Sequence, residues 1–440
     1  MTIKRDVLRR LSAVAHEQSN SFVHLAAIAG LDPKTAFRGA DLRGVDFRND
    51  DLSGFDFTGA KLAGANFSRA QGLRNLILGD TKLDLTILPS GSYLAFDPTV
   101  VRSMILRKQP VPLTWRPHIT ELYLDHADLT DARDAQDFFN LRILRINNNA
   151  ITELALTNAS RLESLNADYT EIEDFAALDK AINLTSLSAN NTNIQTLEEL
   201  RSLKNLRDLY LNNSPLRSLN GVENCQNLRR ISLAKTKISL LSPLRNLHAL
   251  EDINISHTEV QTIGDLRNKV NLAELALNGT AVQDLRPLSD CGALRALYAA
   301  GTQITEIGPL AGNSSLKQLN ISNTSINPNT NFEALTKVEQ LWLDNTNIKN
   351  AQQITAMPNL RFLSIQNCPI KNIEEFTRMK TLRFLRVSEA SPTALLRLEE
   401  TQIAVEINGK PANRLTRTWP DHSPIDSVIA RYIQLSERPR

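Results

Sequence analysis

Residues 206–227 read LRDLYLNNSPLRSLNGVENCQN, and the spacing of their leucines decides the fold. Leu209 and Leu211 alternate with polar residues, as in a short strand that points its apolar side chains to one face. Leu216 and Leu219 follow at a spacing that closes the same apolar core. The stretch therefore predicts one coil of a solenoid, made of a strand, a turn and an apolar return.

The same pattern recurs at a fixed period along most of the chain. It follows the frame L-x-x-L-x-L-x-x-(N/T)-x-(I/L), and eleven of its twelve intervals are 22 residues while one is 21. A period of this length is the signature of a solenoid whose neighbouring repeats bury one continuous core. The thirteen repeats begin at Ile119, Leu141, Leu162, Leu184, Leu206, Leu228, Leu250, Leu272, Leu294, Leu316, Val338, Leu360 and Leu382.

This pattern resembles the leucine-rich repeat family, in its 22-residue internalin-like or SDS22-like class. The resemblance implies an α/β solenoid, a horseshoe whose parallel strands line the concave face. Segments such as LSPL at 241–244 and IGPL at 307–310 are too short for a full helix. They predict 3₁₀ turns or an extended return on the convex side.

Threonine replaces the asparagine that the family pattern expects at the ninth position of the frame. We expect these hydroxyls to be buried and to bond the backbone of the neighbouring coil, because a buried hydroxyl needs a partner. The column consists of Thr170, Thr192, Thr236, Thr258, Thr280, Thr302, Thr324 and Thr346.

A second period, of five residues, runs through residues 36–70. A period of five belongs to neither a helix nor a strand, but it fits a coil with four flat faces. The small residues Ala36, Ala60 and Ala65 suit its tight corners. The pattern resembles the pentapeptide-repeat family, which implies a short right-handed quadrilateral β-helix. Its large apolar residues are Phe37, Leu42, Phe47, Leu52, Phe57, Leu62 and Phe67.

The remaining segments predict a connector and two caps, since a solenoid exposes apolar core at both ends. We expect a helical N-terminal cap at 1–35, with helices at 2–18 and from Ser21 to Ala29. The β-helix at 36–70 leads through an irregular connector at 71–118 into leucine-rich repeats at 119–390. A C-terminal cap occupies 391–440.

Within the C-terminal cap, residues 401–410 alternate like a strand and end in an Asn408-Gly409 turn. Ser423 and Pro424 then predict the start of a helix. We expect that helix to dock on the last repeats, and the alternative is that it binds the groove of a partner. Its apolar stripe consists of Ile425, Val428, Ile429, Tyr432 and Ile433.

Charge and cysteine content exclude several functional classes. The chain has 50 basic and 48 acidic residues, which argues against a nucleic-acid partner. It has no run of 18 apolar residues for a membrane span and no apolar secretory core. Cys225, Cys291 and Cys368 are odd in number and dispersed, so they predict packing residues in a cytoplasmic protein rather than disulfides or a metal site.

The chain also lacks the motifs of known catalytic sites, including phosphate-binding glycine loops and zinc-binding histidine pairs. Some bacterial effectors with similar repeats carry a C-terminal cysteine nucleophile, but no cysteine follows Cys368. Catalysis by paired carboxylates stays open. The sequence therefore predicts a protein that is not an enzyme, with no cofactor and no small-molecule substrate. The short pentapeptide segment, with Arg38, Arg43 and Arg48 on one face, argues against mimicry of DNA.

Aromatic residues on the concave face indicate a binding surface. Positions three, five, seven and eight of each repeat face that surface, and the core does not need their side chains. Trp342, Phe362, Phe384 and Arg386 are expected to form one patch, with Tyr298 two coils earlier. The patch either binds a partner or is covered by the C-terminal segment, and the two readings stay open.

A second, more polar zone is predicted on the same face, nearer the N-terminal end of the repeats. It mixes acids, amides and phenols, as an adaptable protein-binding surface does. Concave bases are few (Arg145, Arg230, Lys235 and Arg386), which argues against binding a phosphate backbone. The zone contains Asp168, Tyr169, Asp208, Tyr210, Asn212 and Asp252.

These features predict a non-catalytic bacterial scaffold that binds a protein partner on its concave face. Two alternatives stay open. The chain is a sensor or regulator subunit of a bacterial enzyme or conflict system, or it is a secreted bacterial effector that targets a host protein.

Overall fold

The computed structural model describes most of the chain, in two units. Described are Val14, Glu17, 21–32, 34–62, 65–73, 76–77, 98–108, 111, 116, 119–131, 133, 138–156, 159–413 and 415. The first unit comprises Met1–Ala127, Ala132–Ile146 and Ala155–Leu162. The second comprises Asp128–Asp131, Asn147–Leu154 and Glu163–Arg440.

The first unit begins with a four-sided coil built from the five-residue repeat. Its backbone bridges join residues that lie 20 positions apart, at Asp41↔Lys61, Asp46↔Asn66 and Asp51↔Gln71, and 21 apart at Asp56↔Ile77. Twenty residues are four pentapeptides, so each pentapeptide forms one side of the coil. The seven repeated Phe and Leu side chains are all at least 93% buried inside it. This confirms the β-helix fold, whose pairing extends to Ile77.

Four glycines of this segment recur at the same position of their pentapeptides, at corners of the coil. Gly39, Gly44, Gly54 and Gly59 have φ angles between 66° and 79°, in the left-handed region that disfavours residues with a Cβ. The corners therefore need backbone freedom rather than small side chains. The alanines that the sequence assigned to corners, Ala60 and Ala65, are instead fully buried.

Helix α2 (Phe22–Ile28) packs against this coil. Ser21 caps the helix by accepting a hydrogen bond from the His24 N–H, as the sequence predicts. The Phe22 ring lies 4.7 Å from the Phe47 ring, and the buried Asp50 carboxylate accepts the Phe22 N–H at 2.9 Å. The predicted helix at 2–18 lies outside the described residues, apart from Val14 and Glu17.

The first unit also contains α3 (Pro98–Leu106) and two parallel strands, β1 (Glu121–Tyr123) and β2 (Ile143–Arg145). Leu122 pairs with Leu144, 22 residues later, and both are fully buried. Helix α3 contacts β1, where the Arg102 guanidinium donates to the Tyr123 carbonyl at 2.9 Å.

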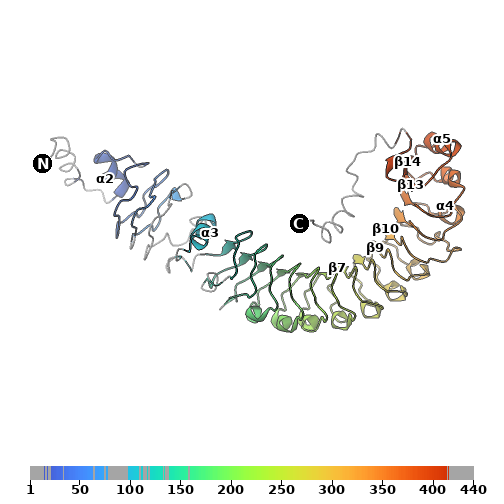
Figure 1. The fold of residues 1–440 in the computed structure, drawn as a ribbon, viewed down its shortest axis with the longest axis horizontal. Helices are drawn as coiled ribbons and strands as arrows, with labels where there is room; N and C mark the ends of the chain where they lie inside the picture. Colours follow the sequence, from blue (N-terminus) through green and yellow to red (C-terminus); the bar gives the residue numbers. More distant parts are fainter. Residues whose placement is uncertain are drawn as a thin grey trace. The chain divides into compact units, whose positions relative to one another are not determined.

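The strands of the second unit lie in chain order within one sheet, and neighbours up to β14 are parallel. They line the inner side of this unit's curve (Figure 1). A hairpin ends the sheet, because β15 turns back antiparallel after Asn408 and Gly409 as predicted. The strands are β3 (Ser164–Asn166), β4 (Ser186–Ser188), β5 (Asp208–Tyr210), β6 (Arg230–Ser232), β7 (Asp252–Asn254), β8 (Glu274–Ala276), β9 (Ala296–Tyr298), β10 (Gln318–Asn320), β11 (Gln340–Trp342), β12 (Phe362–Ser364), β13 (Phe384–Val387), β14 (Ala404–Ile407) and β15 (Lys410–Pro411).

Short helical turns form the outer side of the same curve (Figure 1). The predicted turns at 241–244 and 307–310 are 3₁₀ helices, and each buries its last leucine. Helix α5, capped by Ser391, was not predicted. The helices are η4 (Ala176–Leu178), η5 (Glu198–Ser202), η6 (Val222–Asn224), η7 (Ser242–Leu244), η8 (Gly264–Leu266), η9 (Arg286–Leu288), η10 (Gly308–Leu310), α4 (Gln352–Thr355), η11 (Ile373–Arg378) and α5 (Pro392–Glu400).

The core of this unit is an aliphatic stack with one charged member. Cys225 and Cys291 are fully buried in it, as packing residues should be. Lys269 is also fully buried, and its Nζ donates to the Arg245 carbonyl at 2.6 Å. Burial lowers the pKa of Lys269, because the apolar surroundings disfavour its charged form.

The threonine column is buried as expected, but its bonding differs from the prediction. Each hydroxyl donates to the carbonyl three residues earlier in its own coil, as Thr258 does to Ile255 at 2.7 Å. The expected bond to the neighbouring coil is therefore wrong for these threonines. The reason is reach: the short side chain meets its own turn first. Cys368 contacts the Leu343 carbonyl of the previous coil, with its Sγ 3.0 Å from that oxygen.

We predict that Phe57→Ala destabilises the β-helix by about 3–5 kcal/mol, the usual cost of truncating a buried phenylalanine. Phe57 is fully buried, and its ring lies 5.6 Å from Phe47 and 5.8 Å from Phe55. Hydrogen exchange across residues 36–77 would measure the loss. The control is Phe139→Ala, because Phe139 is 46% exposed. Equal protection in the two variants would contradict the packing described here.

Thr258→Val tests the threonine column. It keeps the shape of the side chain but leaves the buried Ile255 carbonyl without its donor, which costs about 1–3 kcal/mol. Urea unfolding would measure this loss. Thr305→Val, at an exposed threonine, should change stability little. If both variants are equally stable, the hydroxyl is not a structural bond.

Candidate functional site

In several repeats the side chain at the seventh position bonds the backbone of the next coil. The Asp168 carboxylate accepts the Asn190 N–H at 2.7 Å, and the Asn190 side-chain oxygen accepts the Asn212 N–H at 2.8 Å. Asn212 in turn accepts the Ala234 N–H at 2.8 Å. The expectation that the core does not need the seventh-position side chains misses their role in the backbone. The short strand ends before the seventh residue, so the N–H of that residue is paired by a side chain instead of by the sheet.

Three members of this column are carboxylates, Asp125, Asp168 and Asp344. Burial raises the pKa of Asp168 and of Asp344. Hydrogen bonds from Ser188 and Asn190 offset part of that cost for Asp168. Asp168 and Asn212 therefore belong to the framework of the coil rather than to an adaptable surface. Within the polar zone predicted from the sequence, the side-chain oxygens of Asp168 and Asn212 are thus already bonded to the next coil.

The eighth position has a left-handed backbone in every described repeat from Asn148 to Asn367. Asparagine and glycine suit this conformation, and neighbouring asparagines also bond each other, as Asn345 does to Asn323 at 2.9 Å. Tyr169 has the same conformation, with φ 55°, and is 44% exposed. The backbone there favours Asn or Gly, but four large, exposed side chains share this column: His126, Tyr169, Lys235 and His257. Tyr169 is the tyrosine among them.

Beside Tyr169 in the predicted polar zone lies an ion pair on adjacent strands. Arg230 on β6 donates to both carboxylate oxygens of Asp208 on β5, at 2.6 and 2.9 Å. The Arg230 side chain is 54% exposed, and its hydrogen bond to Asp208 raises its pKa. The site prediction included Asp208 and Tyr210 but not Arg230. The sequence could have predicted the pairing of Arg230 with Asp208. Both residues occupy position three of their repeats, and the 22-residue register places these positions opposite each other on adjacent strands.

The structure brings together the aromatic residues of the last repeats. The Trp342 and Phe362 ring centroids are 5.0 Å apart, and those of Phe362 and Phe384 are 5.5 Å apart. The Arg386 guanidinium lies 5.6 Å from the Phe362 centroid and pairs with Glu406 at 2.6 Å. We call Trp342, Phe362, Phe384 and Ala404 the aromatic cluster.

The aromatic cluster is buried. Trp342, Phe362 and Phe384 expose 4%, 3% and 6% of their surface, and Leu415 packs against them. Tyr298, on β9, is also only 4% exposed and donates to the Gln318 side chain at 2.5 Å. Tyr169, Asp208 and Tyr210 remain at least partly accessible. A role of the buried residues in binding a partner stays a prediction.

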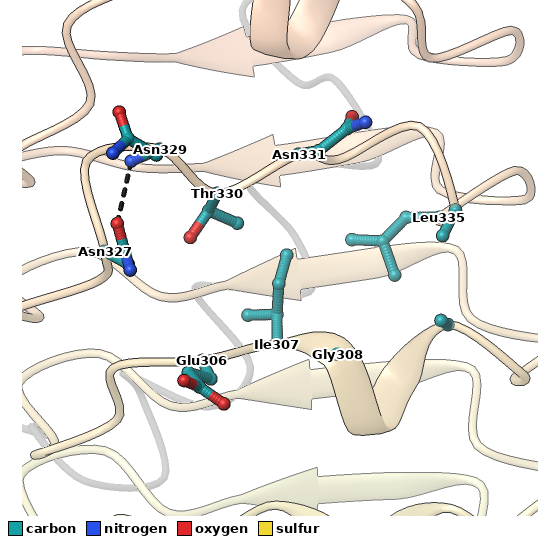
Figure 2. Close-up of a pocket in the computed structure, with 10 residues that line it drawn as sticks. Glu306, Ile307, Gly308, Asn327, Asn329, Thr330, Asn331 and Leu335 are labelled. Atoms are coloured by element: carbon teal, nitrogen blue, oxygen red, sulfur yellow. Dashed lines mark hydrogen bonds between the residues drawn. The ribbon is translucent and has the colours of Figure 1, made fainter.

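The surface of the described residues has two hollows, and the second borders the aromatic cluster through Ala404 and Leu415. One, of about 280 Å³, opens between two coils beside η10, and Figure 2 shows Glu306, Asn327, Thr330 and Leu335 around it. The other, of about 670 Å³, is lined by residues of the C-terminal coils, among them Arg383 and Leu415. Within the described residues, no three His, Cys, Asp or Glu side chains are placed to hold a metal ion. No helix there is long and apolar enough to cross a membrane.

Asp168→Asn separates a structural from a functional carboxylate. Asparagine makes the same bond at Asn190 and Asn212 without a buried charge, so the variant should be more stable at pH 7 by about 1 kcal/mol. The gain should shrink toward pH 4, because the raised pKa means that Asp168 protonates in the folded state before it does in the unfolded state. Melting curves at both pH values measure it. A loss of stability at pH 7 would refute the assignment.

Comparison with known proteins supports this architecture. Residues 40–71 match the family model of pentapeptide repeats, in eight copies. An internalin, inlF, of Listeria monocytogenes is 22% identical, with a TM-score of 0.56, over 67% of this chain and 94% of the internalin. No curated protein sequence matches the chain.

Two further solved structures have the same fold. A leucine-rich repeat protein of Leptospira interrogans is 18% identical over 86% of this chain and 95% of its own, with a TM-score of 0.57. The leucine-rich repeat domain of APL1B is 16% identical over 72% of this chain and 95% of its own, with a TM-score of 0.52. The chain thus combines a pentapeptide-repeat segment with a leucine-rich repeat solenoid like that of the internalins.

Proposed function

We propose that this chain is a non-catalytic scaffold that binds a protein partner on the concave face of its leucine-rich repeats. The observation that carries the proposal is the exposed Tyr169 in a left-handed backbone conformation. Such strain costs on the order of 1–3 kcal/mol and clusters at functional sites. Because the Tyr169 ring is exposed, its burial within the chain does not offset this strain energy. Contact of the ring with a bound partner would offset it.

Arg230 and Tyr210 extend the same surface. Arg230 is fixed by two hydrogen bonds to Asp208, so its guanidinium loses little conformational freedom on binding. Tyrosine and arginine are the residue types most enriched where binding energy concentrates. Tyr210 sits on β5, between Ser188 of β4 and Ser232 of β6. The sheet beneath is rigid, since adjacent strands are bonded in register.

The fold supports this function in general terms, because its parallel strands present a broad face that the core leaves free. The lack of catalytic motifs supports a non-enzymatic role. We further propose a bacterial, cytoplasmic protein without cofactor. The two narrower roles, a sensor or regulator of a bacterial enzyme and a secreted effector, use the same face and differ in the identity of the partner.

Tyr169→Ala combined with Arg230→Ala should reduce partner capture by about 100-fold, since each hot-spot side chain contributes about tenfold. Tagged full-length protein would capture partners from a bacterial lysate, and quantitative mass spectrometry would compare the variants. A captured bacterial enzyme favours the sensor. Capture only from host-cell lysate favours the effector.

The matched control is Leu240→Ala with Arg245→Ala. Leu240 is 68% exposed, and Arg245 is paired with Asp265 at 2.7 Å much as Arg230 is with Asp208. Both precede or follow η7 on the outer side of the coil. Equal loss of capture in the two double variants would show that the concave zone has no special role.

A further inference from the structure

Fifth-position side chains in the middle and late repeats are buried although they point away from the core. Ser232, Asn254, Ala276, Tyr298 and Trp342 expose 6%, 5%, 1%, 4% and 4% of their surface. Successive side chains of a strand point to opposite faces, so these five lie on the concave side. Small residues can be shaded by larger neighbours, but the Tyr298 ring rests on Ala276 and Ala296, within the sheet. These small neighbours lie beneath the ring, and only 4% of the Tyr298 surface is exposed.

The chain reaches the concave face at its C-terminal end. Leu415 packs against the aromatic cluster on β11, β12 and β13. Twenty-five residues, 416–440, follow it. At about 3.3 Å per residue, nine extended residues span about 30 Å. The four strand spacings from β13 to β9 amount to only about 19 Å. Residue 425 is thus within reach of Tyr298.

Charge and apolar pattern match between that segment and the face. Glu274 occupies the third position on β8, next to the strand of Tyr298, and Asp252 occupies the same position on β7, one strand further along. Residues 425–433 carry the apolar stripe already described, and Arg431 and Arg438 supply positive charge.

Two unpaired polar atoms lie along the route. Trp342 Nε1 and Gln340 Oε1 are buried and have no hydrogen-bond partner in the described part of the chain. A buried donor or acceptor left without a partner costs free energy. An extended peptide presents alternating N–H and C=O groups, so one peptide strand crossing β11 could pair with both atoms.

We propose that residues 416–440 bind the concave face of their own chain, with the apolar stripe on Tyr298 and Ala276 and the arginines facing Asp252 and Glu274. The segment then occupies part of the face proposed above for a partner. A partner that needs the aromatic cluster must displace it, and this last consequence alone rests on the proposed function.

Hydroxyl-radical footprinting of the full-length protein tests the proposal without a partner. The variant is Ile429→Asp with Ile433→Asp, in the apolar stripe. The control is Ser427→Asp with Gln434→Asp, which adds the same charge to the opposite helical face. In the wild type and the control, Tyr298 and Trp342 should be oxidised far more slowly than the exposed Tyr169. In the stripe variant their oxidation rates should rise several-fold toward that of Tyr169, with an unchanged circular dichroism spectrum.

Unchanged protection in the stripe variant would overturn the proposal, as would an equal rise in the control. Protection that falls on dilution of the wild type would also overturn it, because a second copy of the chain would then be the cover. A synthetic peptide of residues 416–440, added to the stripe variant, should restore protection if the segment is the occupant. Loss of partner capture in the Tyr169 and Arg230 variant would leave this result unaffected.

Discussion

The hydrogen bond that joins the end of each strand to the next coil controls the rest of this structure. The strands are three residues long, so the sheet stops pairing before the chain has turned. An N–H group left unpaired there would cost about 1–3 kcal/mol. In several coils an Asn or Asp oxygen from the previous coil accepts it, as Asn190 does for Asn212. In others an Asn oxygen of the same coil accepts it, as Asn254 does for Ser256. The left-handed eighth residue and the threonine at the ninth position complete the same turn.

This constraint divides the concave face into two kinds of position. Seventh and eighth positions serve the turn, which explains why Asp168 and Asn212 are framework residues. Fifth positions share this duty where they hold asparagine, as when Asn254 accepts the Ser256 N–H at 3.0 Å. The repeat does not require the side chains of Arg230 and Tyr298 for this bond. Tyr169 matters because it occupies a turn position with a side chain that the turn does not favour. A residue that departs from the type its repeat position favours is therefore a better indicator of a binding site here than a polar side chain is.

Much of the fold was predictable because it is local and repeated. The 22-residue spacing placed Leu209 and its equivalents on strands, and the five-residue spacing placed Phe57 inside a coil with four sides. The acceptor of the Thr258 hydroxyl was not predictable, since the same side chain can reach two coils. Lys269 stands in a column of apolar residues, and only the nearby Arg245 carbonyl accounts for it. For the candidate site, the sequence placed Trp342, Phe362 and Phe384 side by side but gave no measure of their exposure.

The sequence by itself determined the architecture of the coils, the direction in which each side chain points and the neighbours of each residue across the sheet. These follow from periods, and a period sums the same small preference over many repeats. Only the tertiary structure decided which concave residues are accessible. Tyr169 is exposed and Tyr298 is buried although both are concave tyrosines. Burial depends on how the side chains of neighbouring coils pack over one another, as Trp342, Phe362 and Phe384 do.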